Sequence, residues 1–321
     1  MVLRVEDLAT CFFLDEGELR AVDGVSFEID EGETVALVGE SGCGKTIVAL
    51  SIIDLVPSPG RIVRGRVVFR RDDLRKVPAE RLRQVRGGEI GMVFQEPGAA
   101  LNPVFPIGRQ IAEVLELHRG MTRQGAEREA VRVLGEVGIP EPEKRAKSYP
   151  FELSGGMRQR AVIAIATCTR PRLLIADEPT TALDVTVQAE ILDLLRALRD
   201  RHRMATLLIT HDLGVVADMA ERVLVMYTGK LVETGHTAEL FERPKHPYTE
   251  GLLDSVPRLG AGRDVPLLGI PGAVPDLLAL PSGCTFHPRC RLADGECTSE
   301  FPALLEMGEG RRCACYKARA G

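Results

Sequence analysis

The sequence lacks a long hydrophobic run, a basic leader segment and a strong excess of charge of either sign. Its longest continuous apolar stretch, residues 161–166, is far shorter than the roughly 20 residues that span a bilayer, so we do not expect the chain to cross a membrane. The first seven residues lack the basic start and apolar stretch of a signal peptide, which predicts a cytoplasmic protein in which disulfides are rare. A formal net charge of −5 over 321 residues argues against nucleic acid as the main partner.

What is present indicates an α/β fold. Apolar residues make up 45% of the chain, which excludes a disordered protein. Short apolar runs bounded by polar or turn residues predict buried strands. These runs are residues 35–38, 90–94, 173–176, 206–209 and 223–226. Amphipathic stretches lie between them, such as the helical spacing of Ile191, Leu194, Leu195 and Leu198. Alternating strands and helices predict a sheet covered by helices.

The distribution of prolines and helical patterns divides the chain into three parts. We expect residues 1–95 and 154–240 to form the α/β core, and residues 96–153 to form an inserted helical subdomain. Residues 241–321 form a proline-rich C-terminal extension, which we expect to be irregular and to lack a large core of its own. We find no internal repeat and no low-complexity tract.

A glycine-rich segment after the first predicted strand fits the phosphate-loop pattern G-x-x-x-x-G-K-[ST]. Its residues are Gly39, Glu40, Ser41, Gly42, Cys43, Gly44, Lys45 and Thr46. The glycines let backbone N–H groups wrap a phosphate, and the N-terminus of the following helix adds positive potential. We expect Lys45 to reach the β- and γ-phosphates and Thr46 to offer its hydroxyl to Mg²⁺.

Two carboxylates, Asp177 and Glu178, end the predicted strand at residues 173–176. An aspartate at the carboxyl end of a parallel strand suits Mg²⁺ coordination, and the neighbouring glutamate can polarise water. Upstream, Ser154 is a good N-cap, and Gly155 and Gly156 would let a ligand approach the backbone. Within one chain, however, no phosphate partner for this second segment is visible.

These segments occur in the order seen in ABC transporter ATPase subunits, and the resemblance covers about residues 1–240. The motifs that carry it are the phosphate loop, residues 94–97, 153–159, 177–179, 182–184 and 209–212. The resemblance implies a head-to-tail dimer in which each ATP lies between one subunit's phosphate loop and the Ser154-Gly155-Gly156 segment of its partner.

The resemblance also implies roles for single residues. Glu178 resembles the general base, and Asp177 the aspartate associated with Mg²⁺. Gln95 resembles the glutamine that senses Mg²⁺ and the coupling interface, and His211 the switch histidine on the γ-phosphate. Asp184 resembles the aspartate that communicates across the dimer. Phe12 matches the aromatic residue that stacks on adenine, with Phe13 as the alternative register.

Further residues resemble the dipeptide, oligopeptide and nickel importer group, and within it the D-type subunit. They are residues 157–160, 176–188, 243–249, 251–253 and 283–290. The resemblance implies an ATPase at the cytoplasmic face of the membrane. Its implied partners are a second, F-type ATPase, two transmembrane permeases and, indirectly, a substrate-binding protein. Di- or oligopeptides are the first expectation for the cargo, with nickel or another small solute as the alternative. A soluble ABC ATPase without permeases and a redox-sensing module are two further hypotheses.

Cysteines gather in the C-terminal extension, at positions 284, 290, 297, 313 and 315. Such a cytosolic cluster indicates metal binding or redox chemistry, and four thiolates suit either zinc or an iron–sulfur cluster. The spacing has neither the CxxC pairs of most structural zinc sites nor the ferredoxin run. The importer resemblance favours a [4Fe–4S] cluster on Cys284, Cys290, Cys297 and Cys315, with Zn²⁺ as the alternative. Cys313 is the alternative fourth ligand, and His287 could take part in a zinc site. A metal would also stabilise an extension with few apolar anchors.

Overall fold

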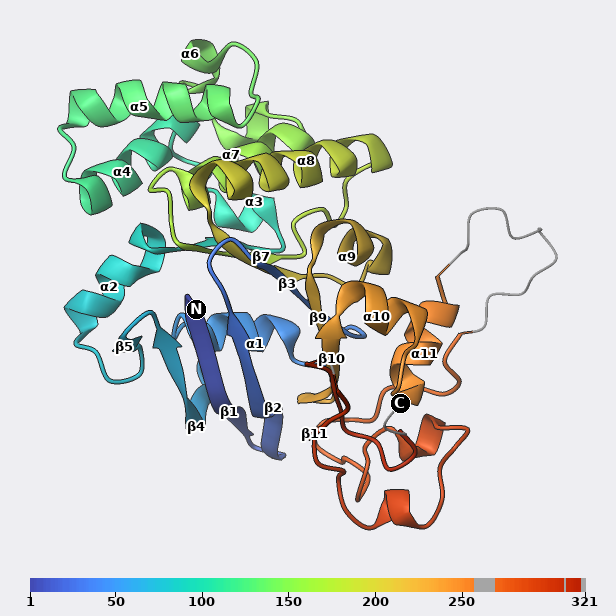
Figure 1. Ribbon diagram of the computed structural model, residues 1–321. Coiled ribbons are helices and arrows are strands. Elements are labelled where there is room, and N and C mark those ends of the chain that lie inside the picture. Colours follow the sequence, from blue (N-terminus) through green and yellow to red (C-terminus); the bar gives the residue numbers. More distant parts are fainter. Residues whose placement is uncertain (257–268, 309, 319–321) are drawn as a thin grey trace. The chain divides into compact units, whose positions relative to one another are not determined.

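The computed structural model describes residues 1–256, 269–308 and 310–318 (Figure 1). These residues form two compact units, each built from segments that lie far apart in the sequence. The first unit contains residues 1–3, 29–33 and 76–208, and the second contains residues 4–28, 34–75 and 209–321. The boundaries predicted for the core, the helical subdomain and the extension stay a prediction.

The first unit contains three neighbouring strands in the order β8-β7-β6. They are β6 (Ile90–Val93), β7 (Leu173–Asp177) and β8 (Ala205–Ile209). Strands β6 and β7 are parallel, with Ile90 opposite Leu173 and Val93 opposite Ala176, so their carboxyl ends lie at one edge. Every residue of β7 and β8 is buried, which explains why both strands are mostly apolar.

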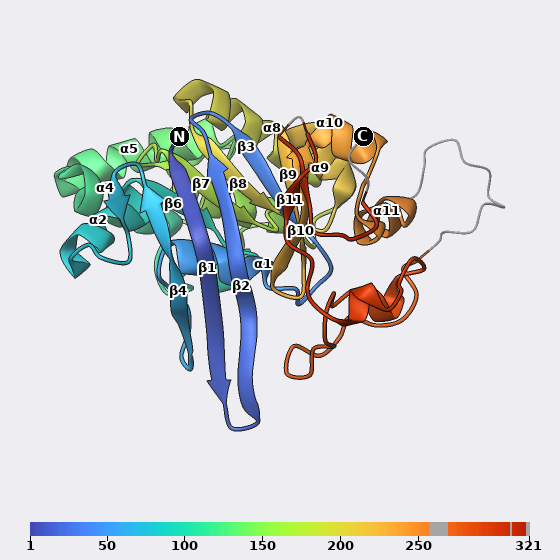
Figure 2. The same ribbon diagram turned by 60° about the horizontal axis from the view of Figure 1, so that its bottom comes forward.

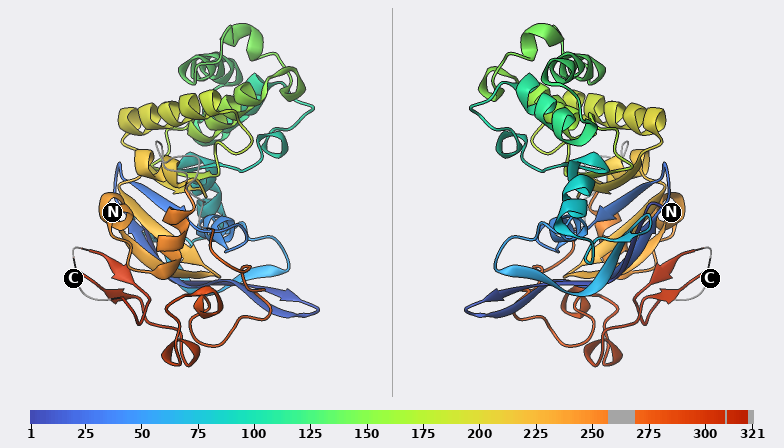
Figure 3. Two further views of the ribbon diagram at one scale, coloured as in Figure 1. Left: turned by 90° about the vertical axis from the view of Figure 1, so that its right-hand side faces the viewer. Right: turned by 90° about the vertical axis from the view of Figure 1, so that its left-hand side faces the viewer.

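Helices make up most of the rest of this unit (Figure 3). They are α2 (Ala79–Gly88), α3 (Pro97–Ala100), α4 (Ile107–Arg119), α5 (Arg123–Glu136), α6 (Pro142–Arg145), the 3₁₀ turn η1 (Pro150–Glu152), α7 (Gly155–Thr167) and α8 (Val185–His202). The described residues between 96 and 153 contain helices and no strand. Helix α4 buries Ile107, Ile111 and Leu115, and α5 buries small residues such as Ala126 and Ala130. No helix in the described part of the chain is long and apolar enough to cross a membrane.

The second unit contains β3 (Thr34–Val38), which leads into the phosphate loop and then α1 (Lys45–Ile52). Strand β3 is parallel to β9 (Arg222–Tyr227), and β9 is antiparallel to β10 (Lys230–His236). The strands predicted at residues 35–38 and 223–226 are therefore confirmed. Helix α9 (Leu213–Met219) packs against β3.

An antiparallel sheet in the second unit was not predicted from the sequence. Its strands, in the order β2-β1-β4-β5, are β1 (Leu3–Leu14), β2 (Gly17–Ile29), β4 (Gly60–Phe69) and β5 (Asp72–Asp73). Figure 2 shows β1, β2 and β4 running side by side. The burial pattern of β2 changes along its length, with Gly17 and Glu18 exposed and Val25, Phe27 and Ile29 buried between exposed residues. Because polar residues interrupt these strands, they lack the continuous apolar run that revealed β3 and β9.

The described C-terminal part of the second unit is mostly irregular and has a small apolar core. Its elements are α10 (Thr237–Glu242), α11 (Pro247–Asp254), the 3₁₀ turns η2 (His287–Arg289) and η3 (Glu296–Thr298), β11 (Leu305–Glu306) and β12 (Arg312–Cys313). Tyr227 of β9, Tyr248 of α11 and Phe286 form an aromatic cluster, with ring centroids 4.6 Å apart for the two tyrosines and 5.3 Å apart for Tyr227 and Phe286. The extension is therefore packed onto β9 by aromatic side chains.

A buried ion pair anchors the end of the extension on β10. The Arg311 guanidinium lies 2.7 Å from the carboxylate of Glu233, and the two side chains are 7% and 0% exposed. The same carboxylate accepts hydrogen bonds from the backbone N–H groups of Lys245, at 2.8 Å, and His246, at 2.9 Å. Glu233 thus links β10, the segment before α11 and the last part of the chain.

We predict that Glu233→Ala destabilises the protein by about 3–5 kcal/mol, because it leaves the Arg311 charge buried without its carboxylate. Glu242→Ala is the control, since Glu242 is 75% exposed in its pair with Arg243, and it should cost less than about 0.5 kcal/mol. Urea unfolding of the full chain measures both. Equal effects of the two variants would show that the Glu233 pair is not a structural anchor.

Candidate functional site

The phosphate loop joins β3 to α1, and its backbone passes very close to its neighbours in the second unit. A Cβ atom on Gly39 would lie 2.2 Å from the carbonyl oxygen of Met226, and one on Gly44 would lie 2.1 Å from that of Ala21. Their φ angles, +153° and +104°, are also ones that residues with side chains rarely adopt. Glycine is therefore required at both positions for two independent reasons.

The middle of the loop has the shape and the chemistry of a phosphate cradle. Gly42 has a φ of +81°, and a Cβ atom built there would have no neighbour within 4 Å, so the loop surface at this point is open. Helix α1 starts directly after Gly44, so its first N–H groups have no partner within the helix and carry positive potential. The residues present thus fit the phosphates of a nucleotide.

Lys45 lies folded against the loop and is only 6% exposed. Its ammonium group donates hydrogen bonds to the carbonyl oxygens of Gly39, at 2.8 Å, and Glu40, at 3.0 Å. Beside it, burial raises the pKa of the Cys43 thiol, which holds this cysteine in its unreactive protonated form. Of these two side chains only Lys45 is therefore charged, and it supplies the positive charge at the loop.

The first unit gathers the residues expected to act on water and Mg²⁺. Asp177 is the buried last residue of β7, and Glu178 follows it with a φ of +48°. Gln95, just beyond the end of β6, donates its amide N–H to Glu178 Oε2 at 3.3 Å. The Thr181 hydroxyl donates to the same oxygen at 2.8 Å. The parallel pairing of β6 and β7 brings Gln95 and Glu178 to one edge, and two hydrogen bonds orient the carboxylate.

The Ser154 segment begins helix α7 as the sequence predicted. The Ser154 hydroxyl accepts the backbone N–H of Met157 at 3.3 Å, and Asp184 caps α8 in the same way by accepting the N–H of Val187 at 3.0 Å. A Cβ on Gly156 would lie 2.8 Å from the Val187 side chain, so the two helix starts are packed together. A Cβ atom on Gly155, by contrast, would have only the Leu183 side chain within 4 Å, at 3.9 Å.

Gln159 also belongs to this part of the site, although no role was predicted for it from the sequence. It is 2% exposed, and its amide donates to the Pro179 carbonyl oxygen at 2.6 Å. This bond ties α7 to the turn that follows Glu178. The burial of Gln159, which requires a hydrogen-bond partner for the amide, is visible only in the folded chain.

The remaining predicted residues lie in the second unit. His211 is exposed and follows Thr210, whose N–H donates to the Leu37 carbonyl of β3 at 3.3 Å. Phe12 is half-buried, and a Cβ on Gly60 would lie 2.6 Å from its ring. Phe13 is 39% exposed, with the Arg61 guanidinium 4.2 Å from its ring centroid. Stacking of Phe12 on adenine stays a prediction.

The prediction of an iron–sulfur cluster on Cys284, Cys290, Cys297 and Cys315 is wrong. These cysteines line one small cavity together with Phe286 and Tyr316. Yet among the residues that the structure describes, no group of three or more His, Cys, Asp or Glu side chains is arranged to hold a metal ion.

The environment of the thiols gives the physical reason. Burial raises the pKa of Cys284 to about 11 and also raises the pKa values of Cys290 and Cys315. At these three cysteines burial therefore disfavours the thiolate form that metal ligation needs. The Cys297 thiol donates to Asp294 at 3.5 Å. Aromatic packing and a buried ion pair stabilise the extension.

Comparison with known proteins identifies the family. The ABC transporter family model matches residues 22–181, and the model of the oligopeptide/dipeptide transporter C-terminal region matches residues 232–297. The chain is 47% identical over 99% of its length to a Sinorhizobium fredii protein named "Probable peptide ABC transporter ATP-binding protein", of which it covers 95%. It is 42% identical over 98% of its length to the dipeptide transport ATP-binding protein DppD of Escherichia coli K12, of which it covers 96%.

A solved structure supports the same assignment. A dimeric ATP-binding cassette in a post-hydrolysis state, bound to ADP and phosphate, aligns with 73% of this chain and 98% of its own, with a TM-score of 0.65 and 26% identity. The chain therefore belongs to the ATP-binding subunits of ABC transporters, in the group with the oligopeptide and dipeptide C-terminal region. The resemblance found in the sequence is confirmed, and the chain is an ATPase that binds ATP with Mg²⁺.

We predict that Gly44→Ala weakens ATP binding at least about tenfold, because a side chain at this φ costs about 1–3 kcal/mol of strain before the clash with Ala21 is counted. Equilibrium binding of a fluorescent ATP analogue to the full chain measures the effect. Gly32→Ala is the control, because Gly32 also has a positive φ (+76°) but open space around it, outside the loop. If both variants bind ATP equally well, the close approach at Gly44 does not shape the site.

Proposed function

We propose that this protein hydrolyses ATP to power the import of di- or oligopeptides through two permease subunits. The observation that carries the proposal is the combination of a complete phosphate loop with the transporter C-terminal region at residues 232–297. Relatives matched along nearly the whole chain are named for peptide and dipeptide transport, which supports this cargo over nickel or another small solute. As an ATPase that serves permeases, the protein would be associated peripherally with the cytoplasmic face of the membrane.

We assign the chemistry to the residues of the motifs one by one. We assign ATP phosphates to the loop of residues 39–46, with Lys45 leaving the Gly39 and Glu40 carbonyls to neutralise their charge. Thr46, Gln95 and Asp177 would hold Mg²⁺, which supplies further charge neutralisation at the phosphates. Glu178, oriented by Gln95 and Thr181, accepts the proton of the attacking water.

The remaining residues act at the γ-phosphate and across a dimer. We assign His211 to the γ-phosphate, and Ser154, Gly155 and Gly156 to the ATP held by a second ATPase chain. Asp184 lies at the start of α8, beside this segment, and would carry communication between the two chains. The second chain is an F-type subunit in this proposal, so the two sites need not be equivalent.

We predict that Glu178→Gln lowers ATP turnover by roughly 10²–10⁴-fold while ATP binding stays near that of the original protein. The amide keeps the size and the hydrogen-bonding position of the carboxylate but cannot take a proton. Phosphate release by the assembled ATPase pair is the measurement, with Glu143→Gln on α6 as an exposed control. Unchanged turnover of Glu178→Gln would remove the general-base assignment.

The cargo is tested separately with the complete importer in proteoliposomes. We expect ATP-dependent uptake of labelled di- or oligopeptides and no uptake of ⁶³Ni²⁺ under the same conditions. Uptake of nickel alone would assign the same ATPase to metal import. ATP turnover without uptake by any permease pair would contradict the transport proposal.

A further inference from the structure

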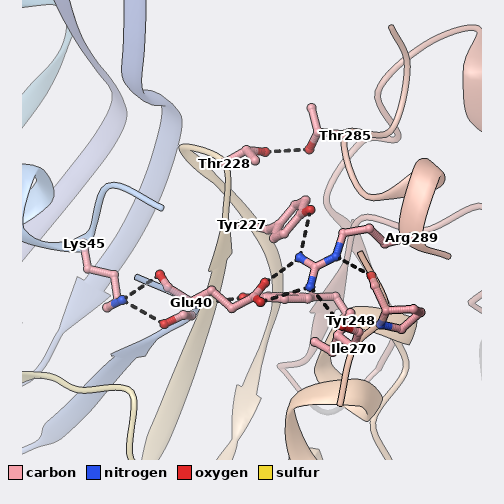
Figure 4. A network of polar contacts seen from close by, with 10 residues as sticks. Glu40, Lys45, Tyr227, Thr228, Tyr248, Ile270, Thr285 and Arg289 are labelled. Atoms are coloured by element: carbon pink, nitrogen blue, oxygen red, sulfur yellow. Dashed lines mark hydrogen bonds and ion pairs between the residues drawn. The ribbon is translucent and has the colours of Figure 1, made fainter. Parts of the chain in front are cut away.

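Arg289, in the 3₁₀ turn η2 of the extension, makes a fully satisfied set of hydrogen bonds (Figure 4). Its two terminal nitrogens donate to the two carboxylate oxygens of Glu40, at 2.7 and 3.0 Å. The other three N–H groups donate to the Tyr227 hydroxyl at 3.3 Å, the Pro271 carbonyl at 2.9 Å and the Ile270 carbonyl at 3.5 Å. The guanidinium therefore has an acceptor for each of its five N–H groups.

Glu40 belongs to the phosphate loop, and all of its polar groups are in use. Its carboxylate holds Arg289, its backbone N–H donates to the Tyr248 hydroxyl at 2.8 Å, and its carbonyl accepts from the Lys45 ammonium at 3.0 Å. One residue thus connects the phosphate-binding lysine to two side chains of the C-terminal extension. The three groups lie within the second compact unit.

We propose that Arg289 and Tyr248 are positioning residues that hold the phosphate loop through Glu40, so that the C-terminal extension sets how tightly the loop binds ATP. This inference rests on the proposed ATPase function and adds a role for the extension in it.

The burial and geometry of these contacts support a positioning role. The Arg289 side chain is 4% exposed and that of Glu40 28% exposed, so water competes little for the pair. A bidentate guanidinium–carboxylate pair fixes orientation as well as distance, which a lysine cannot do. Tyr248 is fully buried and its ring packs at a tilt against Tyr227 and Phe286, so its hydroxyl is a fixed acceptor for the loop N–H.

The contacts of Glu40 affect the affinity for ATP because they order the loop. Lys45 must leave the Gly39 and Glu40 carbonyls to reach the phosphates, and those carbonyls then lose a partner. With Glu40 held from the other side, the loop keeps its shape during this exchange and pays little entropy on binding. If the extension does not hold the loop, the nucleotide itself must order it. We therefore expect the affinity for ATP to fall while the rate of the chemical step changes little.

The matched test compares Arg289→Gln with Arg291→Gln in the full chain. Arg291 is two residues away, and its pair with Glu250 is exposed. We expect Arg289→Gln to raise the Kd for ATP and the KM of the assembled importer about tenfold, with kcat changed less than about twofold. Arg291→Gln should bind ATP like the original protein. Arg289→Lys should recover only part of the loss, because it restores the charge but not the two-point contact.

A double-mutant cycle separates this role from simple stabilisation of the extension. If Arg289 acts through Glu40, then Glu40→Gln combined with Arg289→Gln weakens ATP binding no more than either change alone. Thr285→Val removes the buried hydrogen bond between the hydroxyls of Thr285 and Thr228, at 2.6 Å, without touching Glu40. It should lower the unfolding midpoint and leave the Kd for ATP unchanged.

Tyr248→Phe keeps the proposal testable should Arg289→Gln fail to fold. It deletes only the hydroxyl that accepts the Glu40 N–H, and we expect a weaker but measurable loss of ATP affinity, about threefold to tenfold. Unchanged ATP affinity in a folded Arg289→Gln or in Tyr248→Phe would overturn the positioning role and leave the ATPase intact. Failure of the original protein to bind ATP would instead overturn the proposed function.

Discussion

The close approach of the phosphate loop to two backbone carbonyl oxygens is the constraint on which the second unit depends. Gly39 lies against Met226 at the end of β9, and Gly44 lies against Ala21 of β2. Neither position has room for a Cβ atom, so the loop is confined between a strand of the parallel core and a strand of the antiparallel sheet. The open surface at Gly42 is what this confinement leaves for phosphate.

The C-terminal extension is held by the same physical means as a small protein core. Tyr248 and Phe286 pack on Tyr227, and two arginines of the extension, Arg289 and Arg311, form ion pairs with acidic residues of the ATPase part. The pair with Glu233 lies on β10 and holds the end of the chain. The pair with Glu40 lies on the phosphate loop, which gives the extension a route to the nucleotide. A metal centre is not needed to explain why this segment folds.

The sequence predicted the parts of the fold whose local chemistry is complete in itself. The buried strands are mostly apolar runs, Ser154 caps the helix that follows it, and the phosphate loop has its glycines and lysine in one segment. The antiparallel sheet was not predicted because exposed polar residues interrupt its strands and because its pairing depends on contacts distant in sequence.

The iron–sulfur prediction from the cysteine pattern was wrong because it also depended on the folded environment of the side chains. The cysteines are close together in the sequence, but burial, which the sequence does not reveal, raises the pKa of Cys284 and so disfavours its thiolate. Glu40 and Arg289 are 249 positions apart, and only the folded chain shows that they meet. A contact between a recognisable motif and an arginine far away in the sequence cannot be predicted from the sequence alone.

The most direct test of the account is an experimental structure of the full chain bound to ATP and Mg²⁺. The account predicts that the Lys45 ammonium has left the carbonyl oxygens of Gly39 and Glu40 for the phosphates, while the Glu40 carboxylate still holds both terminal nitrogens of Arg289. A nucleotide bound away from the loop would contradict the account, and so would a loop that binds ATP only after Glu40 has separated from Arg289.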